Sequence, residues 1–535
     1  MAFAYPKAGE VPVAHFQPEY DGSLRYLIDG QVKAWGGKAE PVESCLMLRP
    51  EGGGAPARHR IGMLPRMDEA AALAALDAAV RAWDRGRGEW PTMAVKGRID
   101  AVRQFAKRMA EKRSECVRLL MWEIGKSLKD SEKEFDRTVE YIEATAQALK
   151  ELDRSGNRFS IDGGIVGMIR RSPLGVTLCL GPFNYPLNET FTTLIPAIVM
   201  GNPVVIKLPR YGALCTLPLL EAFRDCFPRG VVNTLSGDGP TTAGTVQKTG
   251  KVDVLAFIGS CRAADILKHD HPAPHRLRCV MGLSAKNPAF VLPDADVDLA
   301  AAEGLLGSLS FNGQRCTALK HFLVHRSIAE AFVAKLAAGV AALKVALPWE
   351  DGAKITPLPE HGKAEKLWGY VEDAVKNGAK VVNHGGGERE GTWFRPAVVF
   401  PVVKAAQLWS TEQFGPVVPV SVYDRDEELF EYVVESRYGQ QASIFGRDAK
   451  KVGALVDVLA NQLCRINLNT QCQRGPDSFP FTGRKDSAEG TLSVTDALRV
   501  FSIRAMVAVR EGGEQIVSDM LMQRTSKFVR TDFIF

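Results

Sequence analysis

The chain has 535 residues, more than one ordinary hydrophobic core holds, so we expect two or three packed units. Hydrophobic residues make up 46% and charged residues 24%, which is typical of a folded globular protein and excludes an extended disordered chain. The formal net charge of +5 comes from 67 basic and 62 acidic residues without a long basic run, so no nucleic-acid partner is indicated. A basic pocket for an anionic ligand is compatible with this charge.

The ten cysteines are widely spaced, without a CxxC pair or paired histidines nearby. Neither a disulfide scaffold nor a metal site is therefore expected. The N-terminal segment MAFAYPKAGEVP lacks a basic stretch followed by an apolar one, and no window reaches the roughly 18 uninterrupted apolar residues of a membrane span. We expect a cytoplasmic protein with no membrane partner.

In chain order, residues 1–66 mix strand and turn patterns. From about Met67 to Leu152, apolar residues recur three and four positions apart, which predicts a block of long helices, and Asp68 is placed to cap the first of them. From Ile165 onward, short apolar runs alternate with helical stretches, a pattern typical of parallel α/β layers.

This alternation predicts two α/β units in succession, with a boundary near residues 286–290. Beyond Ser487, the segment TLSVTDALRVFSIRAMVAVRE has alternating apolar residues and predicts a strand that pairs outside its own unit. No internal repeat of 20 to 50 residues occurs.

A dinucleotide-binding fingerprint is absent, because the nearest glycine cluster, residues 237–239 followed by Gly244, has the wrong spacing. Two strand-to-helix crossings offer other places for a phosphate: VVIKLPR with Lys207 and Arg210, and VLAFIGS with Gly259-Ser260. Backbone N–H groups at such crossings bind anions. Taken alone, each crossing is better explained as an ordinary turn.

Two loops carry candidate catalytic side chains. In SFNGQRCT, Cys316 follows a polar loop beside Arg315, an exposed and electropositive setting that favours the thiolate. A buried thiol is the alternative for Cys316 and the expectation for the other nine cysteines. In GPFNYPLNE, prolines restrict the loop and hold the Asn184 amide as a donor suited to an oxyanion, although a plain turn-forming role is the alternative.

These segments together resemble the aldehyde dehydrogenase superfamily over about residues 60–510. The chain is most similar to its NADP-dependent, non-phosphorylating glyceraldehyde-3-phosphate dehydrogenases, through FNYPLNET and QCQRGPDSFPFTGRKDS. The resembling stretches are Gly181 to Pro186, Val205 to Arg210, Phe257 to Ser260, Lys286 to Leu292, Phe311 to Cys316, Glu412 to Pro416 and Pro480 to Ser487.

The resemblance implies an α/β fold of the aldehyde dehydrogenase type, with a Rossmann-like cofactor domain, an α/β catalytic domain and a β oligomerisation arm. The implied ranges are 1–155 with 178–286 for the NADP-binding domain, 287–485 for the catalytic domain, 157–177 with 486–515 for the arm and 516–535 for a C-terminal tail. A neighbouring subunit would cover the arm's exposed edge, so a homodimer or homotetramer is expected.

The resemblance also implies a mechanism. Cys316 would attack an aldehyde carbonyl, the Asn184 amide and the Cys316 N–H would hold the oxygen, and hydride would leave for the nicotinamide, giving a thioester. The segment that usually carries the general-base glutamate reads MGLSAK here and places Gly282 at that position. Because glycine cannot move a proton, another carboxylate must serve, or coenzyme A or phosphate takes the acyl group, or turnover is slow.

Arg210 stands where NAD-preferring relatives often have a glutamate, and its charge favours a 2′-phosphate, so NADP is expected over NAD. The implied cofactor-binding residues are Pro182, Phe183, Lys207, Arg210, Gly259, Ser260, Glu412 and Phe414. The implied residues for a substrate phosphate are Arg137, Tyr185, Arg315 and Arg474.

The leading hypothesis is an NADP-dependent dehydrogenase that oxidises a small anionic aldehyde, glyceraldehyde-3-phosphate to 3-phosphoglycerate being the best candidate. An acylating dehydrogenase that passes the acyl group to coenzyme A is the nearest alternative. Gly282 motivates a third, a catalytically reduced member that acts as a binding or scaffold protein.

Overall fold

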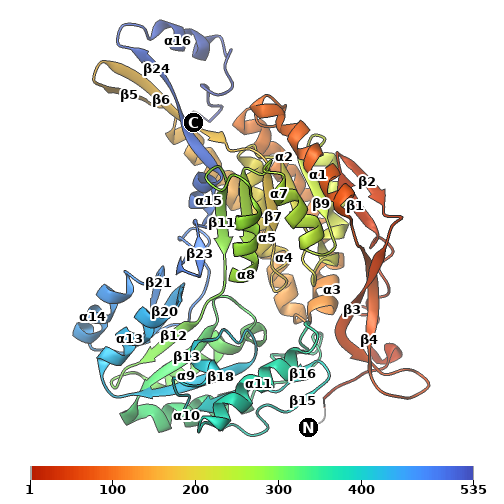
Figure 1. Ribbon diagram of the computed structural model, residues 1–535, viewed down its shortest axis with the longest axis vertical. Helices are drawn as coiled ribbons and strands as arrows, with labels where there is room; N and C mark the ends of the chain where they lie inside the picture. Colours follow the sequence, from red (N-terminus) through yellow and green to blue (C-terminus); the bar gives the residue numbers. More distant parts are fainter. Residues whose placement is uncertain (1–2, 534–535) are drawn as a thin grey trace.

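The computed structural model describes residues 3–533 and contains two largely parallel sheets, one above the other in Figure 1, and an arm that projects at the upper left. Residues 1–2 of the expected N-terminal unit and residues 534–535 of the expected tail lie outside the described residues. The C-terminal end of the chain lies near the arm, and the N-terminal end lies below the lower sheet.

The predicted helical block is confirmed. Its helices are α1 (Glu69–Trp83), α2 (Val95–Ala110), α3 (Arg113–Ile124) and α4 (Leu128–Ser155). The Asp68 side chain caps α1 as predicted, since it accepts a hydrogen bond of 2.9 Å from the Ala71 backbone N–H. Ser127 caps α4 in the same way, with 3.1 Å between its hydroxyl and the Asp130 N–H.

The predicted strands of the N-terminal segment form two antiparallel pairs. These strands are β1 (Arg25–Ile28), β2 (Gln31–Ala34), β3 (Ala39–Leu48) and β4 (Ala57–Pro65). The long β3–β4 pair runs down the right side of the molecule in Figure 1 and reaches the level of the lower sheet.

The upper sheet has six strands in the order β23-β11-β10-β7-β8-β9. Their bounds are β7 (Thr177–Leu180), β8 (Val204–Lys207), β9 (Val232–Leu235), β10 (Val254–Ile258), β11 (Arg278–Gly282) and β23 (Ala488–Glu489). All neighbours are parallel except β23. The chain winds outward from β7 in both directions, so a topological switch point lies between β7 and β10, where open α/β sheets bind ligands at the carboxyl ends of their strands.

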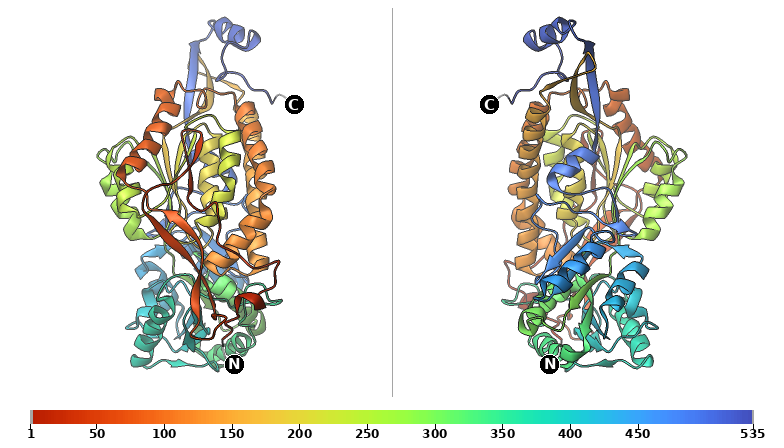
Figure 2. Two further views of the ribbon diagram at one scale, coloured as in Figure 1. Left: turned by 90° about the vertical axis from the view of Figure 1, so that its right-hand side faces the viewer. Right: turned by 90° about the vertical axis from the view of Figure 1, so that its left-hand side faces the viewer.

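Helices cover both faces of this sheet, as the side views in Figure 2 show. Its helices are α5 (Asn188–Val199), α6 (Leu220–Cys226), α7 (Thr245–Lys248) and α8 (Cys261–Asp270). Leu178 and Leu180 of β7 pack into the core shared with α1, whereas Cys179 packs into the core shared with α5. A Cβ on Gly181 would lie 1.6 Å from the Thr190 hydroxyl, so only glycine lets the loop after β7 pass this close to α5.

The lower sheet has seven strands in the order β14-β17-β18-β13-β12-β20-β21 and is parallel except at β14. Its strands are β12 (Asn287–Val291), β13 (Leu319–His325), β14 (Lys380–Val381), β17 (Ala397–Phe400), β18 (Val417–Tyr423), β20 (Gln441–Phe445) and β21 (Arg465–Leu468). Its helices are α9 (Val297–Leu309), α10 (Arg326–Ala341), α11 (Lys363–Lys376), α12 (Gln407–Ser410), α13 (Asp426–Glu435) and α14 (Ala449–Leu459). Two further small pairs are β15 (Arg389–Glu390) with β16 (Trp393–Phe394), and β19 (Tyr438–Gly439) with β22 (Arg484–Lys485).

The arm is a three-stranded antiparallel sheet in the order β24-β6-β5. Its elements are β5 (Phe159–Asp162), β6 (Ile165–Pro173) and β24 (Ser502–Arg510), with α15 (Val494–Val500) before β24 and α16 (Gln515–Met522) after it. The prediction of a strand is wrong for the first half of TLSVTDALRVFSIRAMVAVRE. Ser493 caps α15, and Ala497 and Leu498 are buried on one helical face, so local capping and packing override the alternation there.

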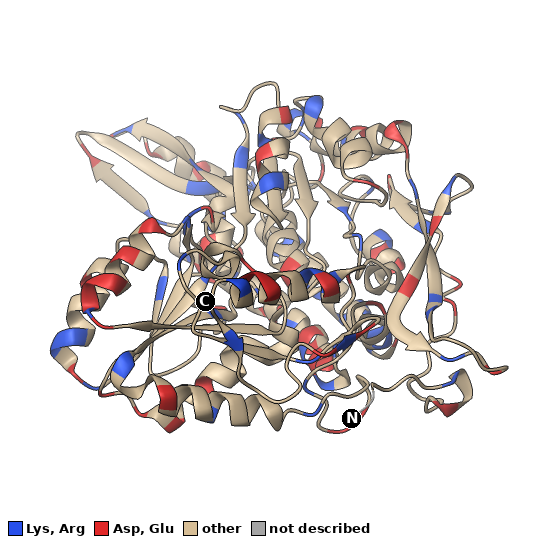
Figure 3. Ribbon diagram, turned by 60° about the horizontal axis from the view of Figure 1, so that its bottom comes forward, with Lys and Arg blue, Asp and Glu red and all other residues tan. Residues whose placement is uncertain are grey.

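Charged residues of both signs are interspersed over the helices of both sheets (Figure 3). Among residues 3–533, no helix combines the length and the apolar character that a membrane crossing requires.

Candidate active site

The residues predicted to meet a cofactor lie at one edge of the upper sheet, the carboxyl ends of its parallel strands. Leu180, the last residue of β7, stands in register with Lys207 of β8 and with Phe257 of β10. Gly282, the last residue of β11, is in register with Ile258. The loops that follow these strands therefore meet at the switch point, although they lie far apart in the sequence.

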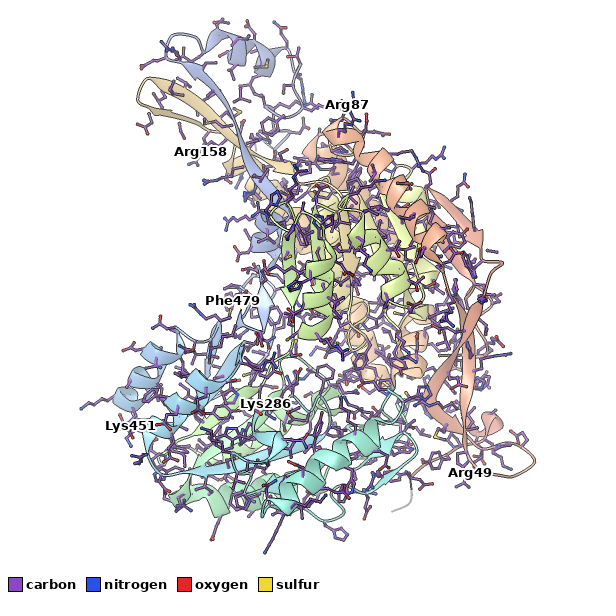
Figure 4. All side chains as sticks on the ribbon, in the orientation of Figure 1. Arg49, Arg87, Arg158, Lys286, Lys451 and Phe479 are labelled. Atoms are coloured by element: carbon purple, nitrogen blue, oxygen red, sulfur yellow. The ribbon has the colours of Figure 1, made fainter. Side chains whose placement is uncertain are left out.

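The amino ends of the lower sheet's strands face this edge. Lys286 directly precedes β12, Cys316 precedes β13 by three residues, and Glu412 and Phe414 precede β18. Figure 4 labels Lys286 where the two sheets approach each other. The fold thus brings the predicted nucleophile to the loops of the upper sheet.

A hydrogen bond joins the two predicted catalytic loops. The Asn184 Nδ2 atom is buried and donates to the Gln314 carbonyl over 2.8 Å, two residues before Cys316. An asparagine amide has two N–H groups, so one of them is still available. Among the described residues, none accepts a hydrogen bond from the Cys316 backbone N–H. The second Asn184 N–H group and the Cys316 N–H are therefore two available donors at the cysteine loop, of the kind that can stabilise an oxyanion.

A buried ion pair anchors the loop of Asn184, and sequence reasoning missed it. Lys126 pairs with Glu134, both side chains are fully buried, and the Lys126 ammonium donates to the Asn184 carbonyl over 2.7 Å. Glu134 also accepts hydrogen bonds from the backbone N–H groups of Leu187 and Asn188, at 3.0 and 3.2 Å. The sequence did contain one indication of this pair: Glu134 is an acidic residue at a position of α4 that the apolar periodicity places on the buried face.

The loop before the cysteine adopts a strained backbone. Phe311 and Asn312 have φ angles of 48° and 55°, and Gly313 follows at 68°. Asn312 is fixed by Thr356, to which it donates and from which it accepts, at 3.0 to 3.1 Å. A Cβ on Gly313 would lie 2.8 Å from the Gly415 carbonyl, so a glycine is needed where the loops of β13 and β18 meet.

The thiol of Cys316 is only partly exposed, and burial raises its pKa to about 11, with the nearby Glu189 carboxylate as the second cause. The expectation of an exposed thiol at Cys316 is therefore wrong; cations lie nearby as expected, Lys320 and Arg474, but desolvation outweighs them. The Cys316 carbonyl is held from two sides, at 2.8 Å from Asn287 Nδ2 and 2.7 Å from Lys320 Nζ.

Two of the arginines predicted to bind a substrate phosphate already have acidic partners. Arg474 forms a buried ion pair with Glu189, and its Nε lies 3.5 Å from Asp477. Arg137 binds Asp477 through two nitrogens at 2.7 and 3.1 Å. We call these four residues the arginine–carboxylate cluster. Sequence reasoning missed its two acids, although both stand within the segments that carry the resemblance.

The two other residues predicted at the substrate phosphate are placed differently. The Tyr185 ring lies 3.6 Å from the Lys126 ammonium and in edge contact with the Phe311 ring, so it forms a wall between the two loops. Arg315 donates to the Gly307 carbonyl over 2.7 Å, on the helix before the cysteine loop. A role for any of the four in substrate binding stays a prediction.

Glu412 lies between the two sheets. Its carboxylate accepts a hydrogen bond of 3.1 Å from the Ala285 backbone N–H and forms an ion pair of 2.9 Å with the buried Lys320 side chain. Phe414, at a φ of 45°, brings its ring to 5.8 Å from that of Phe183. Lys320 therefore connects the Cys316 carbonyl to Glu412, a link for which the sequence offered no signal.

Lys207 and Arg210, here called the cofactor-side cations, follow β8. The pKa of Lys207 is lowered to about 8, mainly by burial; Glu40 and Asp238 oppose this shift, and neighbouring Arg210 adds a smaller lowering. Arg210 is exposed and stacks over the Tyr211 ring at 5.6 Å. Within residues 3–533, no carboxylate lies within ion-pair distance of either cation.

The turn after β10 has the features of an anion site. Ser260 caps α8 by accepting from the Ala263 N–H, and the Gly259 N–H donates to the Gly282 carbonyl over 3.0 Å. A Cβ on Gly282 would meet only ordinary contacts, the nearest at 3.5 Å from Ile258. The backbone therefore does not require glycine at position 282, and the missing carboxylate is a chemical feature of this chain.

Fold and site together define a two-sheet enzyme scaffold with a cysteine between the two sheets, and the sequence pattern of the aldehyde dehydrogenase family matches residues 55–507. The chain belongs to this family. It is 33% identical over 426 residues to the NADP-dependent glyceraldehyde-3-phosphate dehydrogenase of Streptococcus equinus, covering 79% of this chain and 87% of that protein. It is 31% identical to the enzyme of the same name from Apium graveolens, covering 77% and 83%.

A crystal structure of NADP-dependent glyceraldehyde-3-phosphate dehydrogenase from Bacillus halodurans, complexed with NADP, superposes with a TM-score of 0.82. The two chains are 28% identical, and the match covers 91% of this chain and 99% of that one. The predictions of family and fold class are thereby confirmed.

Proposed function

We propose that this protein is an NADP-dependent aldehyde dehydrogenase that oxidises a small anionic aldehyde, with glyceraldehyde-3-phosphate to 3-phosphoglycerate as the best candidate reaction. The observation that carries the proposal is the 2.8 Å hydrogen bond from Asn184 to the Gln314 carbonyl, which sets an amide donor beside the cysteine loop. The names of the relatives from Streptococcus equinus and Apium graveolens support the choice of aldehyde and cofactor.

The residues at the carboxyl edge of the upper sheet fit a dinucleotide with a 2′-phosphate. The cofactor-side cations lack acidic partners among the described residues, so their charge is available to a phosphate. The first turn of α8 after Gly259-Ser260 offers backbone N–H groups to the pyrophosphate. Glu412, Phe414, Pro182 and Phe183 are proposed for the nicotinamide end. When bound, the cofactor supplies the hydride acceptor.

Cys316 supplies the nucleophile. Its sulfur, once deprotonated, forms a C–S bond to the aldehyde carbonyl carbon, and the oxygen takes the negative charge between the Asn184 amide and the Cys316 N–H. Loss of hydride from that carbon leaves a thioester on Cys316. Hydrolysis then breaks the C–S bond, and water supplies the hydroxyl of the acid while the sulfur regains a proton.

Hydrolysis needs a proton acceptor, and Gly282 cannot provide one. We propose Glu189 for this role, because it is a buried carboxylate whose charge acts on the Cys316 thiol and which Arg474 fixes in place. It lies in the first turn of α5, directly after the loop that carries Asn184. If Glu189 does not serve, transfer to coenzyme A is the second candidate, and the lack of a carboxylate at position 282 is the observation that favours it.

For the substrate we propose that an anionic group binds at the arginine–carboxylate cluster with Tyr185 and Arg315. An arginine fork matches a phosphate in geometry. We also propose the cofactor, catalytic and arm ranges implied by the resemblance, together with assembly of identical subunits through the arm, whose outer face exposes large apolar side chains such as Ile161 and Met506.

The test is NADPH formation by the full chain with glyceraldehyde-3-phosphate, with and without coenzyme A, and with Cys316→Ala as control. Sustained turnover without coenzyme A supports hydrolysis. A single burst of one NADPH per subunit that coenzyme A relieves supports the acylating alternative instead. Measurable NADP binding without oxidation of glyceraldehyde-3-phosphate or other aldehydes would support the third hypothesis, a binding or scaffold protein.

A further inference from the structure

A cavity of about 380 Å³ lies at the base of the arm. Its wall combines the last turns of α4, the end of β6 and the junction between α15 and β24. Because α4 has 28 residues, its two ends are about 40 Å apart. Lys126 and Glu134 stand at the other end of this helix, so the cavity is separate from the candidate active site.

Five arginines and a single carboxylate line the cavity. The arginines are Arg98, Arg170, Arg171, Arg499 and Arg504. The carboxylate, Asp153, is already paired with Arg170, and Arg499 is paired outside the cavity lining with Asp496 at 3.2 Å. In the described part of the chain, no carboxylate lies within ion-pair distance of Arg171 or Arg504.

Arg171 and Arg504 are directly opposite each other in the register of β6 and β24. Like charges at such a position destabilise a sheet. Among the described residues, Arg171 donates only to uncharged oxygens, the Ser502 hydroxyl at 3.0 Å and the Arg499 carbonyl at 3.2 Å. Burial is the main cause that lowers the pKa of Arg171, and the like charges of Arg499 and Arg504 lower it further.

Arg170 adds a buried donor without a partner. Its side chain is 5% exposed, and its Nη1 atom has no hydrogen-bond acceptor among the described residues. A buried donor without an acceptor is costly, and a bound anion would remove that cost. Most of the remaining wall is apolar, with Leu149, Leu152, Ile169 and Met200 among the lining residues beside Ser155.

We propose that this cavity binds a phosphate monoester whose organic part is small and apolar. Arg171 and Arg504, together with the unpartnered Nη1 atom of Arg170, suit the phosphate, because guanidinium forks bind its oxygens in pairs. The apolar wall suits the body of the ligand, and the volume falls within the roughly 300 to 1,000 Å³ of small-molecule sites. The site is independent of the proposed reaction.

The test is calorimetric titration of the full chain with phenyl phosphate, inorganic phosphate and phenol. We expect phenyl phosphate to bind about tenfold more tightly than inorganic phosphate, because only the ester also buries an apolar ring, and phenol to bind too weakly to measure. Equal affinity for the two anions would contradict the proposed ligand class.

Three variants locate the binding. Arg171→Gln and Arg504→Gln should each weaken phenyl phosphate binding about tenfold or more. Arg510→Gln is the matched control, since Arg510 is an exposed arginine on the same strand that does not line the cavity, and it should leave binding unchanged.

Arg504→Gln should also raise the melting temperature of the protein without ligand, because it removes the repulsion between Arg504 and Arg171, whereas loss of a merely structural residue would lower it. Unaltered binding in both cavity variants, or no binding by the unmodified chain, would overturn the proposal.

Discussion

The arginine–carboxylate cluster and the cofactor-side cations each contain two basic side chains, but only in the cluster do carboxylates balance the positive charge. In the cluster, Arg474 and Arg137 share the carboxylates of Glu189 and Asp477, and Arg474 is buried. At the other side of the candidate site, Lys207 and Arg210 have no acidic partner within residues 3–533.

This difference indicates how each region responds to a ligand. An anion that enters the cluster must compete with carboxylates that are already in place, so part of its attraction to the arginines is lost. An anion at the cofactor-side cations meets charge that is otherwise unsatisfied. We therefore expect charge changes to affect chemistry in the cluster and ligand choice at Arg210.

The largest effect is expected for Glu189→Gln, which removes the carboxylate that balances the charge of Arg474 in the cluster. If Glu189 is the base, steady-state NADPH formation falls about 100- to 10,000-fold. At the same time the pKa of Cys316 falls, because the Glu189 charge raises it, so iodoacetamide should alkylate Cys316 faster at pH 8. A fall in turnover with faster alkylation distinguishes lost proton transfer from a damaged thiol site.

Two checks accompany this variant. Removing one partner of a buried pair costs about 3 to 5 kcal/mol, so the melting temperature must show that the variant is folded. Asp477→Asn is the matched control, since it removes the other acid next to Arg474, and it should change KM for the aldehyde while sparing deacylation. Unchanged turnover in Glu189→Gln would eliminate Glu189 as the base.

The next largest effect is expected at Asn184, whose amide is the proposed oxyanion donor. Asn184→Ala should reduce kcat about 100- to 1,000-fold, or roughly 3 to 4 kcal/mol, because one of two oxyanion donors is lost. Asn188→Ala is the control, since Asn188 is also a buried asparagine and its side chain has no hydrogen-bond partner among the described residues. Equal kcat losses in the two variants would indicate a packing effect and not an oxyanion hole.

Arg210→Glu tests the cofactor-side cations, which have no acidic partner among the described residues. A charge-assisted hydrogen bond contributes about 1.5 to 3 kcal/mol, so NADP affinity should fall roughly 10- to 100-fold while NAD affinity stays the same or rises. Fluorescence titration with both cofactors measures this. Arg87→Glu makes the same charge change at an exposed arginine outside the proposed cofactor edge and should not alter the preference. A parallel loss of NAD and NADP binding would contradict the proposed role of Arg210.

The smallest effect is the pH dependence of NADP binding. The pKa of Lys207 is lowered to about 8, so its charge is present below pH 8 and is lost as the pH rises through that value. NADP affinity should fall between pH 7 and pH 9, by at most about tenfold per pH unit. Lys207→Arg keeps the charge at pH 9 and should flatten the profile. A profile that is the same in both proteins would assign the dependence to another group.

Local patterns in the sequence were sufficient for most of the secondary structure. The helical block, the Asp68 cap and the strand before each site loop were predictable, because periodicity and capping depend on residues a few positions apart. The strand prediction failed at α15, where packing against α4 and α5 decided between two readings of the same apolar spacing.

The sequence by itself determined the family, the fold class and the order of the candidate site loops, since these reside in short contiguous motifs. Only the tertiary structure decided which charges meet. Glu189 and Arg474 are 285 residues apart, and Arg137 and Asp477 are 340 apart. It also decided the surroundings that raise the pKa of Cys316, because desolvation and nearby charges depend on packing that a linear sequence does not specify.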